Sequence, residues 1–282
     1  MGSASMTMAA DVQATVDETY FGCLPVNRVS GADVSQWQAR NTEPKVNVDF
    51  AKMKAMGVQF AFVRVFCKGY YDAAFQRSWA GAKQAGIIRG AYIALDYRAN
   101  IESQVQKSIN WLINDPGELP IAIDFEKLLY AGLGSEKAMN RLQAAVELVD
   151  ATFGKKCIIY TNPDAIVNFC KWLPGWFISH DLWVAHYGVV TVGPNVGYQY
   201  FTKPGLPKGG FRFWQYTDRG DGILHGCQSK QIDLDWWNGT RAELLDYCKL
   251  APDVEVPAPV GLEARVADLE KRVTRLEGKA GG

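Results

Sequence analysis

The stretch Leu119-Pro-Ile-Ala-Ile-Asp-Phe-Glu126 carries the strongest structural signal of the chain. Its apolar residues fall on both faces of a strand, which is typical of a parallel strand covered on both sides. Asp124 and Glu126 end the stretch, and because side chains alternate along a strand, both carboxylates are expected on the same side. Two acids on one face repel each other, so this pattern favours a site in which one acid is protonated and the other charged. The alternative is a strand end in solvent with both acids hydrated.

Segments that resemble strands alternate with segments that resemble helices on both sides of this stretch. Apolar, β-branched and aromatic runs predict strands at 31–37, 60–67, 87–96, 119–126, 156–160, 182–187, 211–218 and 231–237. Apolar residues at helical spacing predict helices at 46–57, 72–86, 101–113, 135–153 and 240–250, with a further helix that begins at Pro163. Residues 188–210 are rich in glycine and proline and are expected to form a long loop. This order favours an α/β fold, an irregular (β/α)8-type barrel, with a doubly wound open sheet as the alternative.

Polar side chains recur where the predicted strands end, which is where barrels of this type place their active sites. Asp33 follows the first strand, Asp96 the third, and Asp233 and Asp235 belong to the last. An acidic cluster with aromatic residues and no cationic centre fits glycoside hydrolysis. In that reaction one acid protonates the leaving oxygen, while other carboxylates stabilise the transition state or activate the nucleophile. For Asp96, capping of the next helix is an equally good explanation.

Composition excludes several classes of partner for this chain of 282 residues. Lys+Arg and Asp+Glu both number 30, so the zero formal net charge does not favour nucleic acid or an anionic membrane. The six cysteines form no CxxC pair and the three histidines are scattered, so we expect neither a metal nor a cofactor. No apolar run approaches the roughly 20 residues of a membrane span. Because no signal peptide is apparent, we expect synthesis in the cytoplasm.

Five segments in order resemble the motifs of glycoside hydrolase family 25. They are the segments GADVSQWQ at 31–38, AIDFE at 122–126, LWVAHY at 182–187, WQYTD at 214–218 and IDLD at 232–235. This family contains the Chalaropsis-type lysozymes, or N-acetylmuramidases, common as bacteriophage endolysins and bacterial autolysins. The resemblance implies an irregular β/α barrel that cleaves the β-1,4 bond between N-acetylmuramic acid and N-acetylglucosamine in peptidoglycan glycan strands.

The resemblance also implies roles for individual residues. Glu126 matches the general acid, and Asp124 matches the second carboxylate, which stabilises the transition state or assists the substrate's N-acetyl group as nucleophile. Asp33 and Asp233 match acids that line the groove. The candidates for substrate contacts are Tyr92, Asp96, Tyr160, Trp183, Tyr187, Trp214, Gln215 and Asp235. For Tyr92 and Trp183, ordinary packing in the barrel is at least as good an explanation. The second strand departs from the family at 64–69, where RVFCKG replaces a Lys-Ala-Thr/Ser-Glu-Gly-like run.

The predicted domains are an N-terminal arm at 1–28, the catalytic barrel at 29–250, a proline-rich linker at 251–260 and a coiled-coil helix at 261–278. The heptad positions of that helix are Leu262, Val266, Leu269, Val273 and Leu276. Valine at a and leucine at d favour a dimer, whereas the Arg-h-x-x-h-Glu pattern resembles short trimeric coiled coils. A single helix docked on the barrel is the alternative.

Three functions are consistent with these patterns. The first, which we favour, is a peptidoglycan hydrolase that acts on the bacterial cell wall as a phage endolysin or a lysin carried on a virion. The second is a glycan-binding barrel without catalysis. The third is a structural component of a virion, joined to the particle by the coiled coil.

Overall fold

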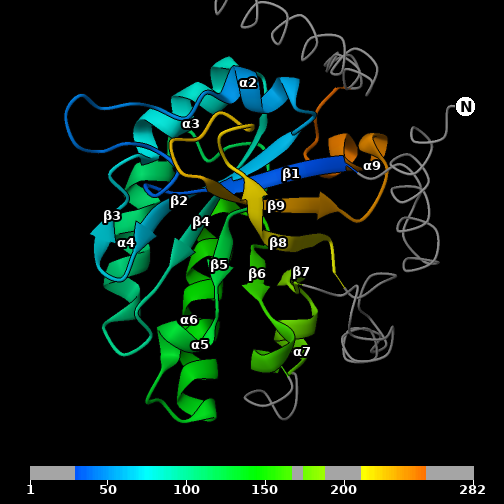
Figure 1. Cartoon of the computed structure of the whole chain (residues 1–282). Helices are drawn as coiled ribbons and strands as arrows, with labels where there is room; N and C mark the ends of the chain where they lie inside the picture. The colour runs from blue at the N-terminus through cyan, green and yellow to red at the C-terminus, as the bar shows by residue number, and fades with distance from the viewer. Residues whose placement is uncertain (1–28, 167–173, 188–210, 252–282) are drawn as a thin grey trace, which may run out of the picture.

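Eight strands close into a barrel, shown in Figure 1. The computed structural model describes residues 29–166, 174–187 and 211–251. The barrel strands are β1 (Val29–Val34), β2 (Phe60–Cys67), β4 (Ile88–Ala94), β5 (Ala122–Asp124), β6 (Ile158–Thr161), β7 (Asp181–Ala185), β8 (Phe213–Asp221) and β9 (Gln231–Trp237). Their order is β1-β9-β8-β7-β6-β5-β4-β2, and pairing of β1 with β2 closes the ring. The predicted irregular (β/α)8-type barrel is therefore confirmed, and an open sheet is excluded.

The strand β9 runs opposite to both of its neighbours and makes the barrel irregular. It is antiparallel to β1 and to β8. The other neighbouring pairs of the barrel, β1–β2, β2–β4, β4–β5, β5–β6, β6–β7 and β7–β8, are all parallel. We expected the last strand to be parallel to the others, with Asp233 and Asp235 at its C-terminal end, and this expectation was wrong because β9 runs in the opposite direction. The antiparallel register pairs Asp233 with Asp33, so β9 starts at the end of the barrel where β1 finishes. Asp233 therefore lies near the beginning of its strand and not at the end.

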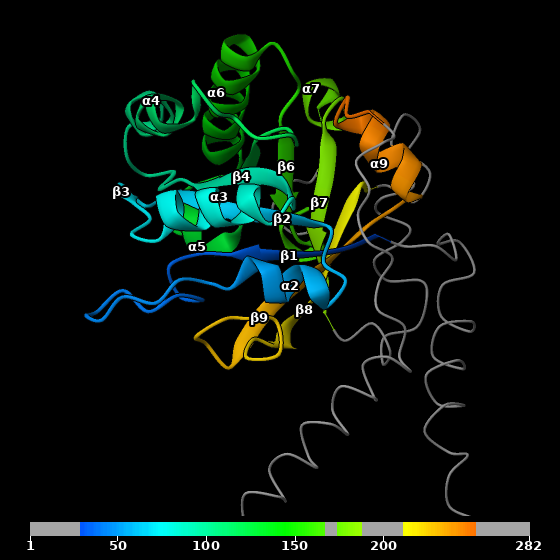
Figure 2. The same ribbon diagram turned by 90° about the horizontal axis from the view of Figure 1, so that it is seen from above.

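Helices cover the outside of the barrel, as Figures 1 and 2 show from two sides. They are α2 (Phe50–Ala55), α3 (Phe75–Gln84), α4 (Ile101–Leu112), α6 (Ser135–Phe153) and α9 (Arg241–Tyr247), with single turns at α5 (Lys127–Tyr130) and α7 (Gly175–Ile178). The helix α2 is shorter than predicted because the Asp49 side chain caps it by accepting from the Lys52 amide at 2.9 Å. Thr240 and Glu243 form a capping box that starts α9.

The apolar residues form two separate cores. The larger core lies between the sheet and the helices, and it includes Val63, Ile93 and Ile123, whose side chains point out of the barrel. The smaller core fills the barrel itself. Burial on both faces explains why these strands read as continuous apolar runs in the sequence.

Aromatic rings fill the barrel interior. Phe62 stacks on Trp183 with ring centroids 4.3 Å apart, and Phe60 packs against Phe213 at 5.3 Å. Glycine makes room for these rings, because a Cβ added at Gly31 would lie 2.1 Å from the Phe60 ring. The lower barrel is thus packed solid, and a pocket is possible at the rim where the parallel strands end.

The described helices include none that is long and apolar enough to cross a membrane. The predicted N-terminal arm, the loop at 188–210, the linker beyond 251 and the coiled-coil helix lie outside the described residues.

Candidate active site

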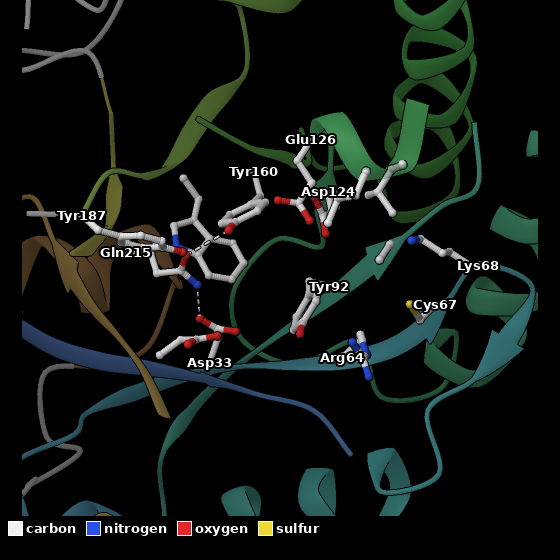
Figure 3. A pocket seen from close by; sticks show the side chains of 15 residues that line it. Asp33, Arg64, Cys67, Lys68, Tyr92, Asp124, Glu126, Tyr160, Tyr187 and Gln215 are labelled. Atoms are coloured by element: carbon white, nitrogen blue, oxygen red, sulfur yellow. Dashed lines mark hydrogen bonds between the residues drawn. The ribbon is translucent and has the colours of Figure 1, made fainter. Parts of the chain in front are cut away.

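A pocket of about 330 Å³ opens at the end of the barrel where the parallel strands terminate. Figure 3 shows its side chains, which come from all eight barrel strands and from the segments that follow them. Nine of the residues proposed from the sequence line it: Asp33, Tyr92, Asp124, Glu126, Tyr160, Trp183, Tyr187, Gln215 and Asp233. The topology therefore gathers most of the predicted candidates into one cavity.

Asp124 and Glu126 enter the pocket from the same side, as the alternation of side chains predicts. The strand β5 ends at Asp124, but Glu126 keeps an extended backbone with φ −135° and ψ 163° before α5 begins. Phe125 between them points away into the outer core, where its ring meets Tyr97 edge-on at 5.2 Å. The backbone is held there because the Phe125 amide donates to the Tyr160 carbonyl at 2.8 Å.

Asp33 and Asp233 form a second acidic pair in the pocket, and Figure 3 shows Asp33 across the pocket from Asp124 and Glu126. They are direct cross-strand partners on β1 and β9, which places their side chains next to each other on one face of the sheet. Burial and the neighbouring Asp233 charge raise the pKa of Asp33 well above its usual range. Burial also raises the pKa of Asp233, to about 6, although a hydrogen bond with Asp33 opposes this rise. The pair is therefore built to keep a proton at pH values where a free carboxyl group would be ionised.

A hydrogen-bond network centred on Gln215 fixes Asp33. The Gln215 amide Nε2 donates to Asp33 Oδ2 at 2.5 Å, and its Oε1 accepts from the Tyr160 hydroxyl at 2.9 Å and also from the Tyr187 hydroxyl. Two hydroxyl donors on the oxygen leave the amide nitrogen facing Asp33, so the glutamine cannot flip without losing all three bonds. Gln215 thus connects β1, β6 and the segment after β7 around the pocket.

Burial also raises the pKa values of the first acidic pair. Asp124 is only 6% exposed, and desolvation followed by the Glu126 charge raises its pKa well above the usual range. Glu126 is more accessible, and burial raises its pKa to a lesser degree. Since burial opposes the ionisation of both groups, the pair keeps a proton to higher pH than two free carboxyl groups would. Asp124 is the more deeply buried of the two, so burial opposes its ionisation more strongly than that of Glu126.

Two cations reach the pocket from the end of β2. Arg64 pairs through Nε with Asp72 Oδ2 at 2.9 Å, so most of its charge is neutralised within the fold. Lys68 follows β2 and lines the pocket beside Cys67. Both cations lower the pKa of Asp124, and Lys68 also lowers that of Glu126. They therefore oppose the effect of burial on the first acidic pair.

Three residues proposed as substrate contacts do not line this pocket. Asp96 pairs with Arg98 at 2.8 Å in the segment after β4, and these bonds lower its pKa. Trp214 points to the outside of the barrel, where its indole donates to the His186 carbonyl at 2.9 Å. Asp235 is fully buried below the pocket and accepts from the Trp183 indole at 2.8 Å. Trp214 and Gln215 are adjacent on β8, so their side chains point to opposite faces of the sheet. Asp235 lies two residues beyond Asp233 on β9 and therefore faces the same interior at a deeper level of the barrel.

Six further residues line the pocket, and the sequence analysis assigned them no role. They are Arg64, Cys67, Lys68, Ala94, Leu128 and Leu129. The departure of the 64–69 segment from the family pattern was the available signal for the first three. Leu128 and Leu129 belong to the single turn α5, which is too short to produce a helical pattern.

Within the described parts of the chain, one group of side chains has metal-ligand spacing, namely Asp150, Cys157 and His180. It lies apart from the pocket, and its polar atoms are already used. Asp150 accepts from the Cys157 amide at 2.7 Å and meets His180 Nε2 at 2.8 Å, while His180 Nδ1 lies 2.7 Å from the Trp176 carbonyl oxygen. These bonds join α6 to the starts of β6 and β7, so a structural role accounts for the group.

The sequence and the fold both match known proteins. The family model of glycosyl hydrolases family 25 matches residues 32–223. The uncharacterized protein YegX of Escherichia coli K12 is 30% identical over 221 residues, which cover 77% of this chain and 72% of that protein. Lysozyme M1 of Streptomyces globisporus is 28% identical over 244 residues, which cover 81% of this chain and 74% of that protein.

Solved structures show the same architecture. The bacterial lysozyme from Streptomyces coelicolor superposes with a TM-score of 0.63 and 25% identity, covering 79% of this chain and 98% of that one. A family 25 glycosyl hydrolase from Bacillus anthracis gives 0.60 and 23% identity, covering 78% of this chain and 93% of that one. The family model spans most of the described barrel. The chain belongs to glycosyl hydrolase family 25 and is a glycoside hydrolase of the lysozyme type.

Proposed function

We propose that the protein cleaves the β-1,4 bond between N-acetylmuramic acid and N-acetylglucosamine in bacterial peptidoglycan, with Glu126 as the general acid. The observation that supports this most is the pocket in which Asp124 and Glu126 share one wall above a floor of aromatic rings. Carboxyl groups with raised pKa values are what acid catalysis of glycoside hydrolysis requires near neutral pH.

In this mechanism Glu126 gives its proton to the glycosidic oxygen, because it is the more accessible acid of the pair. Asp124 lies deeper and stabilises the positive charge that develops on the sugar ring. That developing charge favours the ionised form of Asp124, which the cations Arg64 and Lys68 already support. The proton of the pair then resides on Glu126 as the transition state forms, although burial favours Asp124 in the free protein. Gln215 holds Asp33 in place at the opposite wall.

Replacing Glu126 with glutamine tests this assignment. Release of reducing ends from purified peptidoglycan should fall by about 10²–10⁴-fold, because the amide cannot donate a proton as an acid does. Binding to insoluble peptidoglycan should persist, since the shape of the pocket is preserved. Asp96→Asn is the matched control, and it should keep activity within about twofold because Asp96 lies outside the pocket. Full activity of Glu126→Gln would refute Glu126 as the acid.

The same experiment separates catalysis from simple attachment. A glycan-binding barrel without catalysis would retain peptidoglycan but release no reducing ends in the wild-type protein. The intact acidic pocket favours catalysis over this alternative.

We further propose that the enzyme serves a bacteriophage, as an endolysin or a lysin carried on a virion, and that residues 261–278 join chains into dimers or trimers. The support for oligomerisation is the heptad spacing from Leu262 to Leu276. Truncation after Leu250 should lower the mass per particle in light scattering to that of one chain. An unchanged mass would refute assembly through the tail.

A further inference from the structure

The cation Lys68 sits in a turn that holds it at the rim of the pocket. Lys68 and Gly69 connect β2 to the two-residue strand β3 (Tyr70–Tyr71), and Cys67 pairs with Tyr70 across the turn. Both connecting residues have positive φ, 47° for Lys68 and 98° for Gly69, as tight hairpins of type I′ require. The Lys68 amide also donates to the Ala94 carbonyl at 2.8 Å, which ties the turn to the end of β4. Lysine is held here in a conformation that residues with a Cβ rarely adopt.

The ammonium group of Lys68 is available to a ligand. In Figure 3 its side chain points toward the wall that carries Asp124 and Glu126. None of the ion pairs within 4.0 Å between described residues includes Lys68, whereas the neighbouring Arg64 is committed to Asp72. Lys68 is exposed at the rim of the pocket, so its side chain can reach a ligand there.

An anionic substrate needs such a cation in this pocket. Asp33, Asp124, Glu126 and Asp233 all line it, and any of them that is ionised repels a negatively charged glycan strand. Muramic acid differs from glucosamine by a lactyl ether that ends in a carboxyl group, either free or joined to a peptide with further carboxyl groups. A lysine at the rim offsets the repulsion at the point where such a carboxylate approaches.

An apolar side chain at the same pocket fits the remainder of a lactyl group. Leu128 lines the pocket from α5 and is 70% exposed, so its side chain offers apolar surface to a ligand. The pocket thus offers both a cation and an apolar surface outside the packed barrel. This combination matches a substituent that carries a methyl group and a carboxyl group.

We propose that Lys68 binds a carboxylate of the substrate and makes the enzyme prefer anionic glycan strands over neutral ones. The carboxylate is that of the lactyl group or of the peptide attached to it. This inference rests on the proposed muramidase function. Lys68 acts on specificity, so its removal should change kcat/KM according to the charge of the substrate and leave the chemistry of the acids in place.

The test compares three preparations of glycan strands: strands with their peptides, strands stripped of peptides, and stripped strands whose lactyl carboxyl groups have been converted to methylamides. Reducing-end release gives kcat/KM on each. Lys68→Met should lower kcat/KM by about 3–10-fold on the anionic strands and by less than about twofold on the methylamide strands. Lys68→Arg should restore most of the activity. Lys137→Met, on the exposed face of α6, removes the same charge elsewhere and should have no such effect.

The outcomes separate the inference from the function on which it rests. A loss with peptide-bearing strands alone assigns the contact to a peptide carboxylate, and a loss with stripped strands alone assigns it to the lactyl carboxylate. A loss with both preparations shows that Lys68 binds either carboxylate. An equal loss on neutral and anionic strands, or no loss on any, would overturn the role of Lys68 while leaving the muramidase function intact. Lack of release by the wild-type protein from all three would overturn both. Lys68→Gly suits the positive φ and provides a second charge-removing variant if Lys68→Met folds poorly.

Discussion

Replacing Asp233 with asparagine should stabilise the protein, and the gain should grow with pH. Burial raises the pKa of this carboxyl group from 3.8 to about 6, so its charged form costs folding free energy. The folded state binds a proton on Asp233 more tightly than the unfolded state does. The stabilisation by that proton is present at low pH and is lost as the pH rises through about 6. Asparagine is nearly the same shape and never carries the charge.

The shift in pKa sets the size of the effect. A rise from 3.8 to about 6 corresponds to roughly 3 kcal/mol between the charged and neutral forms. At pH 8 the wild-type group is charged in both states, so Asp233→Asn should gain about 3 kcal/mol. At pH 4.5 the folded wild-type protein already holds the proton, and the gain should shrink to about 1 kcal/mol.

Urea denaturation at pH 4.5 and pH 8 measures both values. Asp246→Asn is the control, because Asp246 is exposed on α9 and its replacement should change stability by less than about 0.5 kcal/mol at either pH. A destabilised Asp233→Asn variant at pH 8, or a gain that does not depend on pH, would refute the conclusion that burial of this acid costs stability.

Three other substitutions test separate parts of the structure. Gln215→Leu should lower kcat by about tenfold or more with little change in KM, because Asp33 and two tyrosine hydroxyls lose their partner; unchanged kinetics would contradict a positioning role. Arg89→Met should cost about 2–4 kcal/mol in urea denaturation, since Arg89 is buried and binds both Asp115 and Glu118; a neutral result would show that the pairs add nothing. Gly31→Ala should destabilise by about 1–3 kcal/mol through its clash with the Phe60 ring, and Phe60→Leu should relieve that loss.

The sequence predicted the barrel because each interior strand is apolar on both faces. The run before Asp124 and the aromatic run of β2 illustrate this, and both lie in the ring as expected. The apolar runs do not indicate whether a strand is parallel or antiparallel to its neighbours. The reversal of β9 depends on how the chain returns after Asp221, and an apolar run has the same pattern in either orientation.

The residues of the candidate site that follow the ends of parallel strands could be predicted, because these strand ends meet at one end of the barrel. Asp33, Asp124 and Gln215 share the pocket for this reason. Trp214 differs from Gln215 by one position and therefore faces the other side of the sheet. The sequence alone does not fix which of two adjacent residues faces inward.

Short elements escaped prediction on physical grounds. The strand β3 has two residues and the helix α5 has four, so neither shows a period. Lys68 and Leu128 belong to these short elements or to the turn before them, and they reach the pocket because of local backbone geometry. Lysine is not a residue that the sequence marks as a turn former, so the positive φ of Lys68 was not foreseeable.

Mass spectrometry of the soluble products from digested, purified peptidoglycan tests the central claim most directly. Borohydride reduction before the measurement labels each newly formed sugar end. We predict fragments whose reduced end is N-acetylmuramic acid, and we predict that the Glu126→Gln protein yields none above background. Fragments that end in reduced N-acetylglucosamine, cleavage confined to peptide bonds, or no soluble fragments from the wild-type protein would contradict the proposed muramidase activity.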